Sequence, residues 1–186
     1  MTLSEIRMRV KFWSEADRLG PDIPLTHWRL HFKSSMRELC KRKFKHFGDD
    51  AEFRPGAYAV CCSTISLGRR VIVRPGSQLM ADSHGGITIE DDVMMGAGVH
   101  IYVNNHRFDD AGIPIIDQGY YPSAPVVLKK GCWVGANAII LPGVEIGENS
   151  VVGAGSVVTK SIPQRVLAVG CPARVVREIA TGCEGS

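Results

Sequence analysis

The 186-residue sequence contains no apolar run long enough to span a membrane, and its first residues do not resemble a signal peptide. Its six cysteines show neither the paired spacing of a zinc site nor the context of a secreted disulfide framework. The net charge of +3 is small, and a hydrophobic content of 45% is too high for a disordered chain. We therefore expect a cytoplasmic protein with reduced thiols, built as one domain with an appendage.

Residues 128–163 repeat with a period of six. A six-residue step turns an α-helix by roughly 240°, so residues with this spacing cannot form one helical face. Short strands separated by corners would stack them inward instead, and this pattern predicts a hexapeptide β-helix. The first position of the hexads is branched and aliphatic, comprising Leu128, Val134, Ile140, Ile146, Val152 and Val158. The fourth position holds the residue types expected to adopt positive φ most easily, namely Gly131, Asn137, Gly143, Asn149, Gly155 and Ser161.

Weaker hexads extend the repeat toward the N-terminus. They begin at Phe47, slip at Cys61-Cys62 and resume at Leu67, and the segment 84–86 forms a small insertion. Because three hexads make one triangular coil, we expect four to five coils within residues 47–170. The fold class is therefore mainly β, a parallel β-helix.

Two further segments depart from the repeat. The long loop 107–126 follows the second full coil, and its Ile-Pro-Ile-Ile and Tyr-Tyr sequences favour an arm that packs on something over a disordered loop. Residues 171–186 are expected to form a turn, a short C-terminal helix and a tail.

Residues 1–46 are expected to form an N-terminal helical segment, with Thr26 capping a helix that runs to about His46. Apolar residues recur every four positions on it, at Phe32, Met36, Cys40 and Phe44. Residues 26–47 carry seven basic residues against one acid, a charge of +6. We favour a helix whose apolar face caps the open end of the β-helix. Peripheral contact of the basic helix 26–46 with the inner membrane is the alternative, whereas nucleic-acid binding lacks a recognition motif.

Three blocks of sequence resemble the hexapeptide-repeat acetyltransferases, and most closely the sugar O-acetyltransferases that act on galactosides, maltose and nodulation factors. They are GVHIYVNNHRF, GCWVGANAIILPGVEIGENSVVGAGSVVTKSIP and AVGCPARVVREI, in this order within about residues 65–179. The resemblance implies a left-handed parallel β-helix, a homotrimer with active sites between subunits, and acetyl-CoA as donor. It also implies acetylation of a sugar hydroxyl, which we expect to serve surface polysaccharide biosynthesis such as that of lipopolysaccharide or capsule.

His106 is the candidate catalytic residue. It stands where the repeat breaks into the arm, and it aligns with the general base of the resembling family. It would deprotonate the hydroxyl, which then attacks the thioester directly, while a backbone amide stabilises the oxyanion. The arm offers Asp109, Asp110 and Asp117 as partners that could orient the histidine, and Asp117 lies at about the family's loop distance.

The acceptor side departs from the galactoside and maltose enzymes. The asparagine at their sugar site falls on Arg74 here, and an aspartate that contacts the sugar falls near Asp82. Asn104 or Asn105 could supply a replacement amide, although Asn105 occupies an inward position of its hexad.

The donor side matches the family better. Trp133 corresponds to the tryptophan that flanks the catalytic histidine. The other residues implied to line the acetyl-CoA groove are Ala136, Ala154, Thr159 and Lys160, with Arg174 and Arg177 near the nucleotide phosphates.

Other functions remain open at this point. The acceptor could be an amine, on a nucleotide-linked amino sugar or an antibiotic. His84, His100 and His106 resemble the metal-binding histidines of β-helical hydratases, although no metal is expected because the C-terminal blocks would then be unexplained. A catalytically silent trimeric scaffold is the last alternative.

Overall fold

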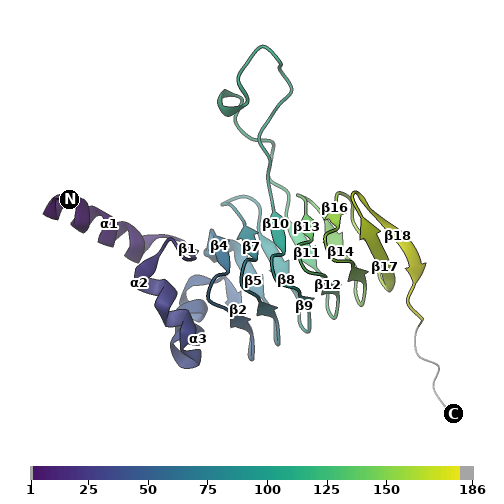
Figure 1. Ribbon diagram of the computed structural model, residues 1–186, viewed down its shortest axis with the longest axis horizontal. Coiled ribbons are helices and arrows are strands. Elements are labelled where there is room, and N and C mark those ends of the chain that lie inside the picture. The colour runs from purple at the N-terminus through teal and green to yellow at the C-terminus, as the bar shows by residue number, and fades with distance from the viewer. Residues whose placement is uncertain (1, 181–186) are drawn as a thin grey trace.

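The structure is a computed structural model that describes residues 2–180. Its body is a parallel β-helix of about six turns, with three faces that each collect one short strand per turn (Figure 1). The first face contains β4 (Tyr58–Val60), β7 (Gln78–Met80), β10 (His100–Tyr102), β13 (Ile139–Ile140) and β16 (Val157–Val158). The second contains β2 (His46–Phe47), β5 (Ile65–Leu67), β8 (Ile87–Ile89), β11 (Val126–Leu128) and β14 (Glu145–Ile146). The third contains β3 (Glu52–Phe53), β6 (Ile72–Val73), β9 (Met94–Met95), β12 (Trp133–Val134), β15 (Val151–Val152) and β17 (Val166–Gly170).

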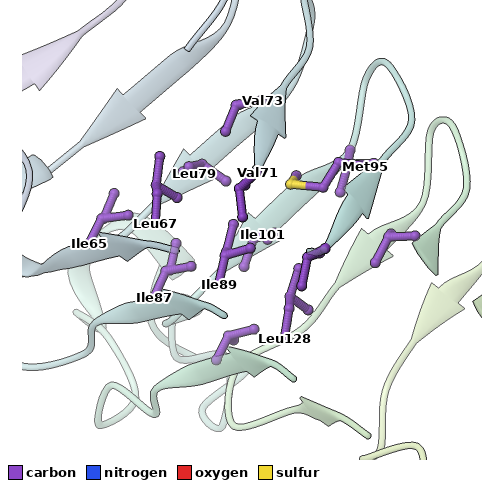
Figure 2. Packing of buried hydrophobic residues seen from close by; sticks show 14 of the residues in the cluster. Ile65, Leu67, Val71, Val73, Leu79, Ile87, Ile89, Met95, Ile101 and Leu128 are labelled. Carbon is purple, nitrogen blue, oxygen red and sulfur yellow. The ribbon is translucent and has the colours of Figure 1, made fainter. Parts of the chain in front are cut away.

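The six-residue pattern forms the core as the sequence predicts. All six aliphatic residues of the first hexad column in 128–163 are fully buried, and the corresponding residues of earlier turns stack in line with them (Figure 2). Five of the six residues in the fourth column adopt positive φ, between 56° and 76°, whereas Ser161 does not. Each buried aliphatic side chain contributes roughly 1.5–3 kcal/mol, so the column is the main source of stability along the axis.

The expected four to five coils undercount the helix by about one turn. Ile162 forms a parallel bridge with Ile146, and β17 then pairs in parallel with β15, which starts a sixth turn. The sequence conceals this turn because β17 is one longer strand with alternating burial, with Val166 and Ala168 inward. A period of two replaces the period of six there.

The N-terminal segment is helical, but it is not one helix from Thr26 to His46. It comprises α1 (Leu3–Glu15), β1 (Arg18–Leu19), α2 (Pro24–His27), a 3-10 turn at Trp28–His31, and α3 (Lys33–Lys43). Thr26 lies buried inside α2, where its hydroxyl donates to the Ile23 carbonyl, and it caps nothing. The chain breaks at Phe32, whose backbone is extended. The four-residue spacing placed Phe32 on the apolar face, but it is 56% exposed.

α3 covers the open end of the β-helix. Its buried residues are Met36, Leu39 and Cys40, and the Phe44 ring that follows packs 5.8 Å from Phe47 and 5.5 Å from Phe53. Most of its basic side chains face outward, where Arg37 pairs with Asp50 at 2.7 Å, whereas Lys43 donates a hydrogen bond to the Ala16 carbonyl. The helix therefore acts as the cap favoured from the sequence. Among the described residues, no helix combines the length and apolar character that a membrane span requires.

The expected short C-terminal helix is a β-strand. β18 (Ala173–Glu178) runs antiparallel to β17 and closes the edge of the third face. Gly170, at φ 103°, reverses the chain, and the β-branched pair Val175-Val176 favours an extended strand over a helix. The expected tail at 181–186 lies outside the described residues.

The loop 107–126 is an arm that projects from the body between β10 and β11 (Figure 1). Its two limbs are held together at the base, where the Tyr121 amide donates to the Asn105 carbonyl and the Ala124 amide to the Val103 carbonyl. A single 3-10 turn, Ile115–Asp117, lies near its tip. The short helix η2 (Cys62–Thr64) marks the earlier slip in the repeat.

Candidate active site

His106 lies at the base of the arm. Its backbone forms an isolated antiparallel bridge with Tyr120, and the next amide, that of Arg107, donates to the Gly119 carbonyl at 2.9 Å. The rings of His106 and Tyr120 are 4.1 Å apart, at an angle of 32°. The backbone therefore fixes where the imidazole emerges, and the side chain remains exposed to a reactant.

The structure does not join His106 to any of the three arm aspartates. Asp109 accepts hydrogen bonds from Tyr121 and Arg107, and the Tyr121 hydroxyl is the main reason that its pKa is lowered. Asp110 accepts from the Gly112 amide within its own turn. Asp117 lies exposed in the 3-10 turn of the arm. Within residues 2–180 of one chain, the imidazole forms no hydrogen bond and packs against the Tyr120 ring.

Asp82 is an internal anchor that forms four hydrogen bonds within the chain, and the sugar contact expected of it from the sequence stays a prediction. One carboxylate oxygen accepts from the amides of His84 and Gly85, and the other accepts from the Asn104 side chain and the Ser123 hydroxyl. Burial raises the pKa of the Asp82 carboxyl, but these four donors together outweigh it and hold the pKa below its ordinary value. The carboxylate ties the insertion at 84–86 to both limbs of the arm.

The other acceptor-side candidates differ in their contacts within the chain. Asn104 is engaged with Asp82 at 2.7 Å. Asn105 does not occupy the inward position expected of it, because the coil ends at the buried Val103 and Asn105 is exposed beside His106. Arg74 donates to the Met95 carbonyl at 3.0 Å and so braces the body.

Trp133 starts a row of outward side chains across the third face. Strand register places Trp133 beside Val151, Val151 beside Leu167, and Leu167 beside Arg177. Adjacent strands are about 4.8 Å apart, so three steps place Trp133 about 14 Å from Arg177 along this row. Trp133 is 48% exposed and Arg177 is exposed, and both are accessible from the same side.

A β-bulge brings Arg174 to the same face as Arg177. Residues three apart in a regular strand point to opposite faces. Here Val176 has no partner, since Val175 pairs with Ala168 and Arg177 with Leu167, while Arg174 pairs with Val169. Leu167 and Val169 are two apart and share a face, so the two guanidinium groups do as well. Sequence spacing alone would have separated them.

Ala136 and Ala154 stand at stacked corners between the third and first faces. Each follows a glycine that the next turn approaches closely: a Cβ on Gly135 would lie 2.5 Å from the Ala154 nitrogen, and one on Gly153 would lie 2.7 Å from the Val169 side chain. The corner amides of Ala136 and Ala154 donate to no group within residues 2–180. Amides of this kind can serve a carbonyl or an oxyanion.

Thr159 and Lys160 lie at a different corner. They follow β16, whereas Ala154 precedes it, so one strand of the first face separates the two groups. Both are exposed. A single chain thus presents the expected donor-side residues on two edges of the β-helix.

The histidines considered for metal binding do not converge. His84 contacts Ser83, and His100 contacts the Tyr102 hydroxyl at 3.3 Å. Within the described part of the chain, no three His, Cys, Asp or Glu side chains are placed to hold one metal ion.

The sequence reasoning missed Tyr120 and Ser123. Both lie on the returning limb of the arm, and they meet His106 and Asp82 only because the limbs pair. The spacing of residues along the sequence does not predict contacts between the two limbs of the arm. The adjacent tyrosines and the loss of the repeat were the only signals that this limb packs on something.

Comparisons with known proteins find acyltransferases that include sugar O-acetyltransferases. The family described as bacterial transferase hexapeptide (six repeats) matches residues 125–160. A galactoside O-acetyltransferase of Escherichia coli K12 is 36% identical over 141 residues, which cover 76% of this chain and 67% of that protein. A solved galactoside acetyltransferase in complex with coenzyme A is 31% identical and superimposes with a TM-score of 0.75, covering 96% of this chain and 82% of the other. A maltose O-acetyltransferase of Clostridium difficile is 26% identical, with a TM-score of 0.71 over 96% and 86% of the two chains.

Proposed function

The chain belongs to the hexapeptide-repeat acetyltransferases, in the group of the galactoside and maltose O-acetyltransferases, and from this premise we propose that it transfers an acetyl group from acetyl-CoA to a sugar hydroxyl. The observation that carries the donor assignment is the row from Trp133 to Arg177, with Arg174 beside it. An aromatic side chain at one end and two guanidinium groups at the other suit a long donor with phosphates at its far end.

We propose His106 as the general base. Its imidazole takes the proton from the acceptor hydroxyl as the oxygen attacks the thioester carbonyl, which forms a C–O bond and a tetrahedral oxyanion. Collapse of this oxyanion breaks the C–S bond, and the departing thiolate takes the proton from the imidazolium. The exposure of His106, at a position fixed by the paired limbs of the arm, supports this role.

The second part of the proposed donor groove is formed by the corner amides of Ala136 and Ala154, which donate no hydrogen bond within the described residues. We place the pantetheine arm along the corners at Ala136 and Ala154, where small side chains let a ligand approach the backbone. One of these amides would stabilise the oxyanion. Thr159 and Lys160 complete the groove from the other edge.

We also propose that the working form is a homotrimer. Donor-side residues that lie on two different corners of one chain can line a single groove only if two copies contribute one corner each. The exposed pair Met94 and Trp133, adjacent on the third face, offers apolar surface for such a contact.

On the acceptor side, Asn105 remains our proposed contact to the sugar, because it is exposed next to His106. Asp117 could reach the acceptor only from the arm, whereas Asp82 and Asn104 would shape the site by holding the arm. We place the reaction in the cytoplasm, on a sugar destined for a surface polysaccharide.

An acceptor screen tests this function. Purified protein is incubated with isotope-labelled acetyl-CoA and a panel of galactosides, maltose, nucleotide sugars, amino sugars and polysaccharide repeat units, and the products are read by mass spectrometry. An O-acetyl ester on a sugar supports the proposal, and base-labile release of the label identifies the ester. An amide product, stable to mild base, would replace it with amino-sugar N-acetylation, and no transfer to any acceptor would overturn it.

A further inference from the structure

Helix α1 presents an apolar stripe that its own chain leaves open. None of its residues is buried, and Figure 1 shows it standing beyond the first turn of the β-helix. Leu3, Ile6, Val10 and Trp13 recur at spacings of three and four, so they form one stripe along the helix. Leu3 is 77% exposed. A stripe of this kind is normally covered.

The charges around this stripe have one sign. On a helical projection Arg9 flanks the stripe on one side, and Arg7 and Lys11 flank it on the other. The two acids of the helix, Glu5 and Glu15, lie on the opposite side. A surface that covers the stripe would therefore be apolar at its centre and acidic at its edges.

The tip of the arm has this complementary character. Ile113, Ile115 and Ile116 are exposed there, with Ile116 at 81%. Residues 107–119 contain three acids, Asp109, Asp110 and Asp117, against one base, Arg107. Like the stripe on α1, the tip of the arm exposes apolar side chains that its own chain does not cover.

The two features do not meet within one chain. Figure 1 shows the arm rising from the middle of the β-helix while α1 lies past its N-terminal end. We propose that the tip of the arm of one subunit packs on the apolar stripe of α1 in a second copy of this chain. Each subunit gives one arm and receives another, as a closed ring requires. The contact would also hold the base of the arm, which carries His106.

This inference rests on the proposed homotrimer but not on acetyl transfer, and cross-linking tests it without turnover. Chains with Val10→Cys and chains with Ile116→Cys, each lacking Cys171 and Cys183, are co-expressed with different tags and oxidised with diamide. A disulfide between the two kinds of chain is expected. Leu25→Cys replaces Val10→Cys as the matched control, because Leu25 is 42% exposed and Val10 41%, and it should give no such product.

Charge reversal adds a second readout. Arg9→Glu in the Val10→Cys chain should slow disulfide formation roughly threefold or more, because it replaces an attraction at the rim by a repulsion. Lys33→Glu makes the same change on α3 and should leave the rate unchanged. Native mass spectrometry of both variants establishes the oligomer independently of the cross-link.

Several outcomes overturn the inference. A trimer in which Val10→Cys and Leu25→Cys cross-link equally well, or not at all, removes the docking site. A Val10→Cys to Val10→Cys disulfide would assign the stripe to pairing of two α1 helices. Loss of the mixed disulfide on adding anionic vesicles that sediment with the protein would assign it to a lipid surface. A monomer would overturn the docking and the proposed trimer together, while the acceptor screen would still decide the chemistry.

Discussion

The Asn104 side chain donates a hydrogen bond of 2.7 Å to Asp82, and so links the corner before the 84–86 insertion to the residue where the arm departs. Ser123, on the returning limb, donates to the same carboxylate oxygen. Because one carboxylate contacts both limbs, the position of the arm relative to the β-helix depends on it. Asp82 therefore positions the arm, and its contact with a sugar stays a prediction.

Replacing Asp82 by alanine should loosen the arm and lower stability. The substitution leaves four donors without their acceptor, and hydrogen bonds to a charged group are worth about 1.5–3 kcal/mol when removed. Partial exposure reduces this, so we expect a loss of about 2 kcal/mol and a melting temperature lower by roughly 4–8 °C. Asp49→Ala is the matched control: Asp49 is exposed and pairs with Lys41 only at 3.7 Å, so its loss should be about 0–1 kcal/mol. Equal melting temperatures for the two variants would contradict the anchor.

The contribution of Asp82 should depend on pH in a defined direction. Its pKa is held below the ordinary value of 3.8 in the folded protein, so its stabilising effect is complete above that value. The effect is lost as the pH falls through the lowered pKa, because the protonated carboxyl resembles an amide. The free-energy difference between the wild type and Asp82→Asn, measured by urea unfolding, should therefore be constant from pH 5 to 7. It should shrink below about pH 4. A difference that grows on acidification would mean that the charged form is not the stabilising one.

The corner glycines should differ sharply in tolerance. Gly135→Ala places a Cβ 2.5 Å from the Ala154 nitrogen, which belongs to the backbone of the next turn and cannot rotate away. We expect a loss of about 1–3 kcal/mol, measured by thermal unfolding. Gly155→Asn is the control, because nothing lies within 4 Å of that position. Its φ of 68° resembles that of Asn137 and Asn149 in the same column, so the change should be nearly neutral.

The predictable parts of the fold are those in which the type of a residue at its repeat position indicates its own burial or backbone conformation. An aliphatic residue every six positions predicts burial, and Asn or Gly in the fourth position predicts positive φ, as at Asn137 and Gly143. The sixth turn was missed because β17 satisfies the same core with a different period. The break at Phe32 was missed because periodicity records which residues are apolar but not where the backbone must bend.

The site was less predictable because its contacts join distant residues. Asn104 is 22 positions from Asp82, and Ser123 is 41 positions away. The shared face of Arg174 and Arg177 depends on an unpaired Val176, which only the register against β17 reveals. The resemblance supplied Asp82, Arg174 and Arg177 as candidates, and the structure shows that the two arginines share a face.

His106→Ala should abolish most of the transfer while the fold persists. The side chain is exposed and forms no hydrogen bond within the described residues, and its ring packs on Tyr120, so the melting temperature should change little. Removing a general base typically costs 10²–10⁴-fold in rate, and we expect kcat for the acceptor found in the screen to fall by about that factor. His46→Ala, another exposed histidine, is the control and should retain activity. Unchanged kcat in His106→Ala would remove the histidine from the mechanism.

Arg174 and Arg177 should act on donor binding and not on the chemical step. Loss of one exposed charge-assisted hydrogen bond to a phosphate is worth about 1.5 kcal/mol, so Arg174→Ala and Arg177→Ala should each raise KM for acetyl-CoA roughly tenfold with kcat unchanged. Acetyl-pantetheine lacks the nucleotide and provides the control within each variant: its KM should be the same as for the wild type. The bulge at Val176 places both guanidinium groups on one face. The variant that lacks both arginines should therefore bind acetyl-CoA more weakly than either single variant, while its KM for acetyl-pantetheine should stay unchanged. If KM for acetyl-pantetheine rises in parallel, the arginines support the β17–β18 pair and do not contact the nucleotide.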